Sequence, residues 1–301
     1  MINNLNLGKL QRIKLGRNNY VYSFKDKSKK KIIKFFKYRK RFIKEINFLK
    51  HLNIMNIKSI PEIEYINEYK KFYICNYIQG KEIKKISRGK VGKCADFINE
   101  INKKKKLNIQ YATEHCESIN DHFKSVKKKI YFLRNFSFKD KKFIKIYKEI
   151  NVKFDKLKEL VKKKKIKLNN KVSKKKLILS PSDFGFHNIK QYQEKLFFFD
   201  FEYSGLDDSK KLICDFFCQP DYVIKIEYFS FFAKKIIGKD EFEKNKEILF
   251  ILLELYAVKW LCIQIKHLYF NPNDLKINSQ EYKLKILKYY NRTKLWKLKV
   301  Y

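Results

Sequence analysis

Hydrophobic and polar residues alternate along several short runs in the first eighty residues, which is the pattern of half-buried strands. This pattern predicts strands at 10–15, 20–24, 31–36, 63–66 and 72–76. Between the third and fourth runs the apolar spacing becomes helical over residues 39–52. One face of this helix would carry Phe42, Ile43, Ile46, Leu49 and Leu52. We therefore expect a small antiparallel sheet with one helix.

Helical spacing dominates the chain from residue 91 onward. We expect helices at 92–103, 110–134, 139–164, 208–218, 221–237, 240–268 and 279–290. Two short apolar runs, 177–179 and 196–199, predict buried strands within this part. The change of pattern near residue 80 predicts a boundary between an N-terminal lobe, 1–79, and a larger C-terminal lobe, 80–301. The predicted fold class is α+β, in the two-lobe layout of the protein-kinase-like fold.

The charge of the chain changes this picture less than its size suggests. The 301 residues are 45% hydrophobic, which is enough for a substantial core and unlike a disordered chain. The net charge of +40 invites a nucleic-acid-binding interpretation. However, only seven of the 71 basic residues are Arg, whose bidentate fork usually grips phosphates and base edges. The excess of Lys also fits a coding bias toward A and T, so we favour a solvated Lys surface and no nucleic-acid partner.

Further features bear on the compartment. The six Cys residues form no CxxC pair, so buried free thiols are favoured over zinc ligands or disulfides. Residues 1–14 lack the apolar core of a secretory signal. The most apolar stretch, 248–265, carries Glu254 and Lys259, which favours a buried helix over a membrane span. We expect a cytoplasmic protein.

Residues that suggest chemistry lie in two blocks near the middle of the chain. In these blocks Asp183 is followed by Asn188 and then by Asp200. Phosphoryl transfer of the kinase type needs an Asp that accepts the hydroxyl proton, an Asn that holds a metal ion and a second Asp that holds the metals on the ATP phosphates. Alone, Asp183 would more often cap a helix, and Asn188 would be structural. In combination they favour a catalytic base and two Mg²⁺ ligands.

Glu202 extends the second block. It lies two residues after Asp200, so on an extended backbone the two carboxylates face the same side and repel unless a cation lies between them. We interpret Glu202 as a second or water-mediated metal ligand. The alternative is a salt bridge from this acidic pair to two of the many Lys residues.

A buried Lys is the other requirement of kinase chemistry. Lys34 lies between Ile33 and Phe35 in the third predicted strand, and Glu45 follows eleven residues later in the helix. In kinases the Lys of such a pair reaches the α- and β-phosphates and the Glu holds the Lys. Lys31 and Lys37 are competitors, but the apolar neighbours and the spacing favour Lys34.

Other positions complete a nucleotide site. The turn that contains Gly16 is compatible with a loop covering the phosphates. We expect a hinge at 75–80, where backbone groups of Asn76 and Ile78 would meet adenine; an ordinary connection is the alternative. For His187 we weigh a phosphate or substrate contact against a role in bracing or packing the loop.

Substrate recognition has weaker signals. If the acceptor is a cation, Trp260, Tyr256 and Glu254 are candidate contacts. The spacing of Tyr256 and Trp260 favours a plain core stripe instead. Asp215 lies among apolar residues, so we expect it to have a buried partner and, as a structural residue, to brace the catalytic loop.

The block SPSDFGFHN, followed by FFFDFEYSGLDDSKKLICDFF, resembles the aminoglycoside phosphotransferase and choline/ethanolamine kinase superfamily. The resemblance is specific over residues 178–220 and extends to 7–80. It implies ATP- and Mg²⁺-dependent phosphorylation of a small-molecule hydroxyl. By this match Asp183 would be the base, Asn188 and Asp200 the metal ligands, and Lys34 and Glu45 the phosphate-anchoring pair. Pro181 and Gly185 stand where the family usually has His, which leaves the acceptor open.

Together these features predict a phosphotransferase with an alcohol group as acceptor. Its cofactors would be ATP and Mg²⁺, and its substrate a sugar, an amino sugar or an amino alcohol. Residues 1–79 would bind the nucleotide, and residues 80–301 would carry catalysis and the substrate. A kinase-fold protein that binds without turnover is the alternative, and a basic nucleic-acid-binding protein is a less favoured one.

Overall fold

The computed structural model describes residues 10–15, 19–105, 108–270, 278–294 and 296. The chain forms two compact units, one made of residues 1–113 and 179–206 and the other of residues 114–178 and 207–301. All the predicted catalytic, cofactor and metal residues belong to the first unit. The lobe boundary expected near residue 80 stays a prediction.

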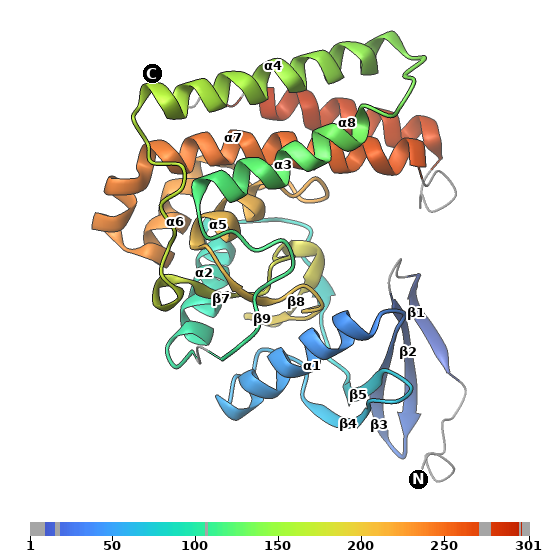
Figure 1. The fold of residues 1–301 in the computed structure, drawn as a ribbon. Helices are drawn as coiled ribbons and strands as arrows, with labels where there is room; N and C mark the ends of the chain where they lie inside the picture. Colours follow the sequence, from blue (N-terminus) through green and yellow to red (C-terminus); the bar gives the residue numbers. More distant parts are fainter. Residues whose placement is uncertain (1–9, 16–18, 106–107, 271–277, 295, 297–301) are drawn as a thin grey trace. The chain divides into compact units, whose positions relative to one another are not determined.

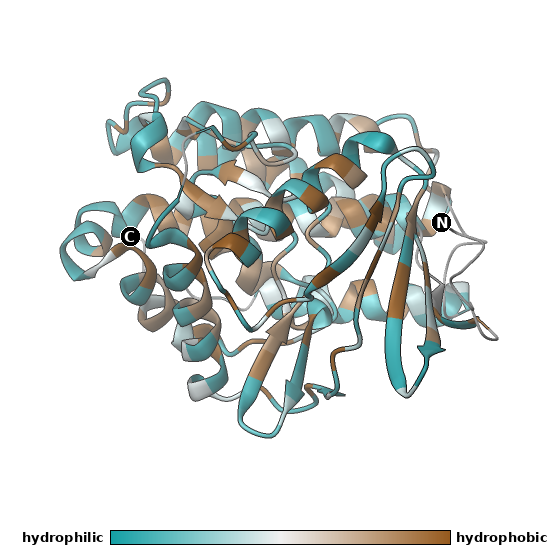
Figure 2. Cartoon of the chain, turned by 90° about the horizontal axis from the view of Figure 1, so that it is seen from below, coloured by the Kyte–Doolittle hydropathy of each residue, from teal (hydrophilic) through white to brown (hydrophobic). Residues whose placement is uncertain are grey.

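A five-stranded antiparallel sheet forms the N-terminal part of the first unit (Figure 1). Its strands, in the spatial order β1-β2-β3-β5-β4, are β1 (Gln11–Leu15), β2 (Asn19–Asp26), β3 (Lys29–Phe36), β4 (Ile63–Asn67) and β5 (Phe72–Asn76). Hydrophobic and hydrophilic residues alternate along the strands (Figure 2), and the buried cluster of the sheet is Phe24, Ile33, Phe72 and Ile74. The predicted strands and their antiparallel arrangement are confirmed.

Helix α1 (Arg39–Ile54) follows β3. Of its predicted apolar face, Phe42, Ile46, Leu49 and Leu52 are buried. Ile43 is exposed, so its inclusion was wrong, and Phe48 is buried instead. The reason is the helical period: Phe48 lies four residues before Leu52 and therefore shares its stripe.

The rest of the first unit surrounds the two chemistry blocks. Helix α2 (Arg88–Asn102) lies on a sheet of β6 (Lys81–Glu82), β8 (Ile189–Tyr192) and β9 (Lys195–Phe198), and β7 (Ile178–Ser180) pairs with β10 (Gly205–Asp207). The Phe97 ring of α2 stacks on Phe198, with centroids 3.8 Å apart, and on Phe184 at 6.1 Å. These rings hold the residue after Asp183 and the strand before Asp200. Strands β6, β8 and β10 were not predicted, because they are short and their pairing comes from distant segments.

Gly205 allows the chain to turn back after the second block. Its φ is +149°, and a Cβ there would lie 2.4 Å from Ala112 N and from Gln110 O. At this close approach Leu206 N donates to Gln110 O, and Ala112 N donates to Leu206 O. Only glycine fits such a position without moving the neighbouring backbone.

We therefore expect Gly205→Ala to lower the midpoint of thermal unfolding by several degrees or to prevent folding, because a methyl group would collide with two backbone atoms. Gly89→Ala is the matched control, since its Cβ in α2 would meet only Ser87 Oγ at 3.9 Å. The control should be neutral or stabilising by about 1 kcal/mol. Equal unfolding midpoints for the two variants in circular dichroism melts would contradict the conclusion that only glycine fits at position 205.

The second unit is helical. Its helices are α3 (Ile119–Leu133), α4 (Lys141–Lys163), α5 (Ser209–Cys218), α6 (Phe229–Ile237), α7 (Lys239–Phe270) and α8 (Ser279–Lys294). Helix α7 packs against each of the other five (Figure 1). Among the residues that the structure describes, α7 is the one helix long and apolar enough to cross a membrane, but 78% of its apolar window is buried. It is therefore a core helix, as predicted.

Two predicted helix boundaries were wrong. The helix expected at 110–134 begins only at Ile119, because Ser118 forms a capping box with Asp121. The helix expected at 221–237 begins at Phe229. The six Cys residues are buried and free, as predicted.

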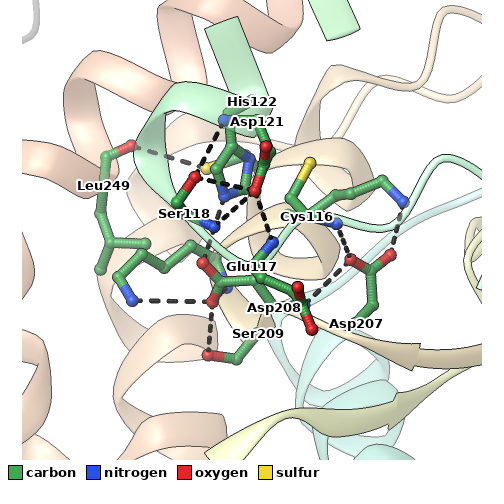
Figure 3. Close-up of polar contacts among 12 residues, drawn as sticks. Cys116, Glu117, Ser118, Asp121, His122, Asp207, Asp208, Ser209 and Leu249 are labelled. Carbon is green, nitrogen blue, oxygen red and sulfur yellow. Dashed lines mark hydrogen bonds and ion pairs between the residues drawn. The ribbon is translucent and has the colours of Figure 1, made fainter. Parts of the chain in front are cut away.

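A polar contact between His122 and Asp208 joins α3 to the N-terminus of α5 (Figure 3). Asp208 caps α5 by accepting from Lys210 N, and its Oδ2 lies 3.1 Å from Nε2 of His122 on α3. Asp207 accepts from Cys116 N and pairs with Lys211. Burial opposes protonation of His122, but Cys116 and Asp208 outweigh it and raise the pKa of His122 to about 10. This contact is therefore an ion pair near neutral pH.

A folded-state pKa above the ordinary 6.5 means that His122 stabilises the fold fully below pH 6.5 and loses this effect as the pH rises to about 10. We expect the urea-derived free energy of unfolding to fall over this interval by about 1–3 kcal/mol more in the wild type than in His122→Gln. His115→Gln, at an exposed position, is the control and should follow the wild type. Parallel pH curves for the wild type and His122→Gln would contradict the ion pair.

Candidate active site

A buried ammonium group lies at the centre of the site. Lys34 on β3 is 7% exposed, and its Nζ lies 2.6 and 2.9 Å from the two carboxylate oxygens of Glu45 on α1. The same Nζ donates to Oδ1 of Asp200 at 2.7 Å. Its competitor Lys31 pairs with Asp26 and Glu64 instead. The structure thus brings together Lys34, Glu45 and Asp200, three of the predicted site residues.

The surroundings of Lys34 keep it charged. Burial opposes its protonation, but the carboxylates of Asp200 and Glu45 outweigh this effect and raise the pKa of Lys34. Burial raises the pKa of Glu45 to about 7, although Lys34 counteracts this rise. The Tyr73 hydroxyl on β5 also donates to Glu45, at 2.8 Å. Glu45 is therefore held by three hydrogen bonds and cannot easily turn away from Lys34.

Each of the three side chains of residues 200–202 contacts either strand β3 or helix α1. Asp200 contacts Lys34, and the ring of Phe201 packs on Phe48 of α1, with centroids 4.9 Å apart. Glu202 forms an ion pair with Arg41 in the first turn of α1, with 3.6 Å between Nη1 and Oε1. Asp200 has a φ of +70°, which is uncommon outside glycine. Such backbone strain often marks functional positions.

Asp183 and Asn188 lie in the loop between β7 and β8. The Asn188 amide Nδ2 donates to the backbone carbonyl of Asp183 at 3.0 Å, which leaves Oδ1 as the atom suited to a metal ion. Nε2 of His187 lies 3.3 Å from Oδ1 of Asp183, so the structure favours the loop-bracing role for His187. Ser182, just before Asp183, has a φ of +66°. The two strained non-glycine residues of the chemistry blocks are thus Ser182 and Asp200, and no sequence signal marked either as strained.

Asp200 and Asn188 suit Mg²⁺ chemically, because both present side-chain oxygens and the Asp200 side chain is 38% exposed. Within the described residues, no three His, Cys, Asp or Glu side chains cluster closely enough to hold a metal. Two oxygen donors of this kind would leave the other coordination positions of an ion to phosphate and water oxygens, which Mg²⁺ commonly uses.

Glu202 has protein partners of its own. Its carboxylate is 5% exposed, and Oε2 accepts a hydrogen bond of 2.8 Å from Nδ2 of Asn19 at the start of β2. Arg41 approaches the other oxygen. Asn19 was expected only as part of the turn 16–19, and Arg41 had no predicted role. A signal for Arg41 was present, because the chain uses Arg at only seven positions.

The other predicted nucleotide contacts are less defined. Gly16 lies outside the described residues. Asn76 ends β5; its side-chain Oδ1 accepts from Glu62 N and its backbone N donates to Glu62 O at 3.2 Å, so both groups serve the sheet. Ile78 is half-buried in the connection after β5. Their nucleotide-binding roles stay predictions.

The candidate acceptor contacts in the second unit have internal partners. The Tyr256 hydroxyl is buried 2.7 Å from Nδ1 of His122, and Glu254 pairs with Lys153. Trp260 Nε1 donates to Asp215 at 2.8 Å. Lys259 holds both oxygens of Asp215, at 2.8 and 2.9 Å, and is the buried partner that we expected; both partners belong to α7 and not to the catalytic loop that Asp215 was expected to brace. These contacts favour the core interpretation of Tyr256 and Trp260.

No protein-family model matches the chain, and no curated protein matches its sequence. Solved structures do match. A choline/ethanolamine kinase family protein from Mesorhizobium loti has a TM-score of 0.66 at 12% identity, with 97% of this chain and 88% of that chain covered. A choline kinase from Streptococcus pneumoniae has 0.62 at 14%, covering 97% and 96%. A spectinomycin phosphotransferase has 0.64 at 16%, covering 96% and 90%.

The chain has the fold of aminoglycoside phosphotransferases and choline/ethanolamine kinases. This confirms the predicted α+β fold class and the superfamily resemblance at the level of fold. At such low identity the comparison concerns the fold, and the chemistry must be argued from the residues of this chain.

The buried ion pair leads to a prediction on stability. Lys34→Met should destabilise the protein by about 3–5 kcal/mol, because the Glu45 carboxylate would remain buried without a cation. Lys31→Met on the same strand is the control and should cost much less, since Lys31 and its partners are partly exposed. Urea denaturation followed by tryptophan fluorescence and circular dichroism measures both. Equal losses would show that Lys34 is not a specially buried charge.

Proposed function

We propose that this protein is an ATP- and Mg²⁺-dependent small-molecule kinase. It would transfer the γ-phosphoryl group of ATP to a hydroxyl of a sugar, an amino sugar or an amino alcohol. The observation that carries the proposal is the three-way contact of Lys34 with Glu45 and Asp200, in a unit that also holds Asp183 and Asn188. Two proteins of the same fold were solved with nucleotides, one with ADP and spectinomycin and one with ATP and streptomycin.

Each residue has a defined task in this proposal. Lys34 presents a fixed positive charge to the α- and β-phosphates; Glu45 holds Lys34 in place and is itself held by the Tyr73 hydroxyl. Asp200 and Asn188 would hold Mg²⁺, which supplies charge neutralisation on the phosphates when bound. Asp183 orients the acceptor hydroxyl and takes its proton as the oxygen forms its bond to phosphorus. The bond between the γ-phosphorus and the bridging oxygen breaks, and ADP leaves. An ATP-dependent reaction of this kind suits the cytoplasm.

His187 supports this task. Its ring lies against the Asp183 carboxylate from the same loop, so it limits the directions in which the carboxylate can point. A base must lie within hydrogen-bond reach of the proton that it accepts, and small displacements are costly to the rate. We therefore assign His187 to positioning and not to proton transfer.

We expect Asp183→Asn to lower turnover by about 10²–10⁴-fold while nucleotide affinity stays within a factor of about three, because the base acts on the acceptor. The assay is acceptor-dependent ADP release over a panel of aminoglycosides, choline, ethanolamine and cell-envelope sugars. Isothermal titration calorimetry with Mg²⁺ and ATP measures the affinity. Asp221→Asn, which changes an exposed Asp paired with Lys285, is the control and should match the wild type.

Equal rates for the wild type and Asp183→Asn across the panel would overturn the proposal. A wild-type protein that binds ATP with Mg²⁺ but phosphorylates no member of the panel would favour the non-catalytic binding protein. Absence of any Mg²⁺-dependent ATP affinity would remove the nucleotide from the proposal altogether.

A further inference from the structure

Glu202 lies where three segments that are far apart in the sequence meet. Asn19 was predicted as the last residue of the turn 16–19 over the phosphates, and in the structure it is the first residue of β2. Arg41 lies in the first turn of α1, the helix that also carries Glu45. Glu202 itself belongs to the block that contains Asp200. One carboxylate therefore contacts the strand after the turn and the helix that holds the buried Lys.

Glu202 and its partner Asn19 are buried, whereas the Arg41 side chain is 26% exposed. Asn19 is 5% exposed, and its amide donates to Oε2 at 2.8 Å. The Arg41 guanidinium lies over the rings of Tyr38 and Tyr203, at 5.1 and 4.8 Å from their centroids. These rings restrict the guanidinium to a narrow range of positions beside Glu202. A buried carboxylate that lost such partners would be destabilising, so the arrangement favours a single conformation.

The residue type at position 41 supports a specific contact. In a chain that places Lys at nearly every basic position, Arg at this point is an exception. The planar guanidinium can lie over two aromatic rings while facing a carboxylate, which a Lys ammonium does less well. Because Arg41 already offsets the charge of the Glu202 carboxylate, a metal ion would stabilise Glu202 less than it would stabilise a carboxylate whose only charged neighbour is another carboxylate.

We propose that Glu202 is a positioning residue that fastens the start of β2 and the first turn of α1 to the block of Asp200. In this role it does not serve as a metal ligand. Its consequence for nucleotide binding rests on the proposed function: Glu202 would hold the start of β2 and α1 in the positions that the nucleotide site needs. Loss of Glu202 would loosen the start of β2 and α1 together, and would leave the metal affinity nearly unchanged.

The first test is hydrogen–deuterium exchange of the full chain without nucleotide. Glu202→Ala should speed exchange in peptides that cover residues 19–26 and 39–46. Asn19→Ala should speed mainly the first peptide and Arg41→Met mainly the second. The double variants with Glu202→Ala should exchange no faster than Glu202→Ala alone, because they act on the same contact. Glu64→Ala, which removes another carboxylate of the same sheet, is the control and should leave both peptides unchanged.

The second test separates positioning from metal binding. At a fixed nucleotide concentration, the midpoints of a Mg²⁺ titration should agree within about twofold between the wild type and Glu202→Ala. The ATP affinity should fall about tenfold in Glu202→Ala and measurably in Asn19→Ala and Arg41→Met. A Mg²⁺ midpoint shifted more than about tenfold in Glu202→Ala alone, with unchanged exchange, would overturn the proposal and make Glu202 a metal ligand.

The two proposals can fail separately. If the wild type binds no nucleotide, the proposed function fails, but the exchange experiment still decides whether Glu202 fastens the two segments. If the wild type turns over an acceptor and Glu202→Ala exchanges like the wild type, the proposed function stands and the positioning role is wrong.

Discussion

The burial of the Lys34 ammonium is the constraint on which the first unit depends. A cation in an apolar strand is stable only with close anionic partners, and Glu45 and Asp200 are those partners. Meeting this need fixes the rotation of α1 relative to the sheet and draws in a residue 166 positions later in the sequence. The charge that we propose for phosphate binding is therefore also the charge that the folded unit has to neutralise.

The other contacts of residues 200–202 extend this arrangement. Phe201 adds an aromatic contact to α1, and Glu202 adds a polar one. Stacked rings from α2 hold the residues on either side, Phe184 beside Asp183 and Phe198 before Asp200. The carboxylates of Asp183 and Asp200 thus lie close to packed aromatic rings. This packing limits their movement, as the proposed catalysis would require. The second unit uses the same principle with different residues, since Asp208 and Asp215 are held by His122 and Lys259.

Much of this could be predicted from local pattern. Alternation along the strands and helical spacing after residue 39 specified the sheet and α1, because both depend on short-range periodicity. The spacing of Asp183, Asn188 and Asp200 suggested the phosphoryl-transfer chemistry that we propose. What failed was local detail that depends on distant partners. Ser118 begins α3 nine residues later than hydrophobicity alone suggested, and Phe48 replaces Ile43 on the buried face.

By itself, the sequence determined the fold class and which residue types could carry phosphoryl transfer. Among 64 Lys residues, apolar neighbours and the spacing to Glu45 already favoured Lys34, but only the tertiary structure showed that Asp200 contacts the same ammonium group. It also decided the surroundings of Glu202. Residue spacing showed two neighbouring acidic groups, whereas the folded chain brings Asn19 and Arg41 to one of them. The physical reason is that a carboxylate takes its role from the charges and donors around it, and those come from segments far apart in the sequence.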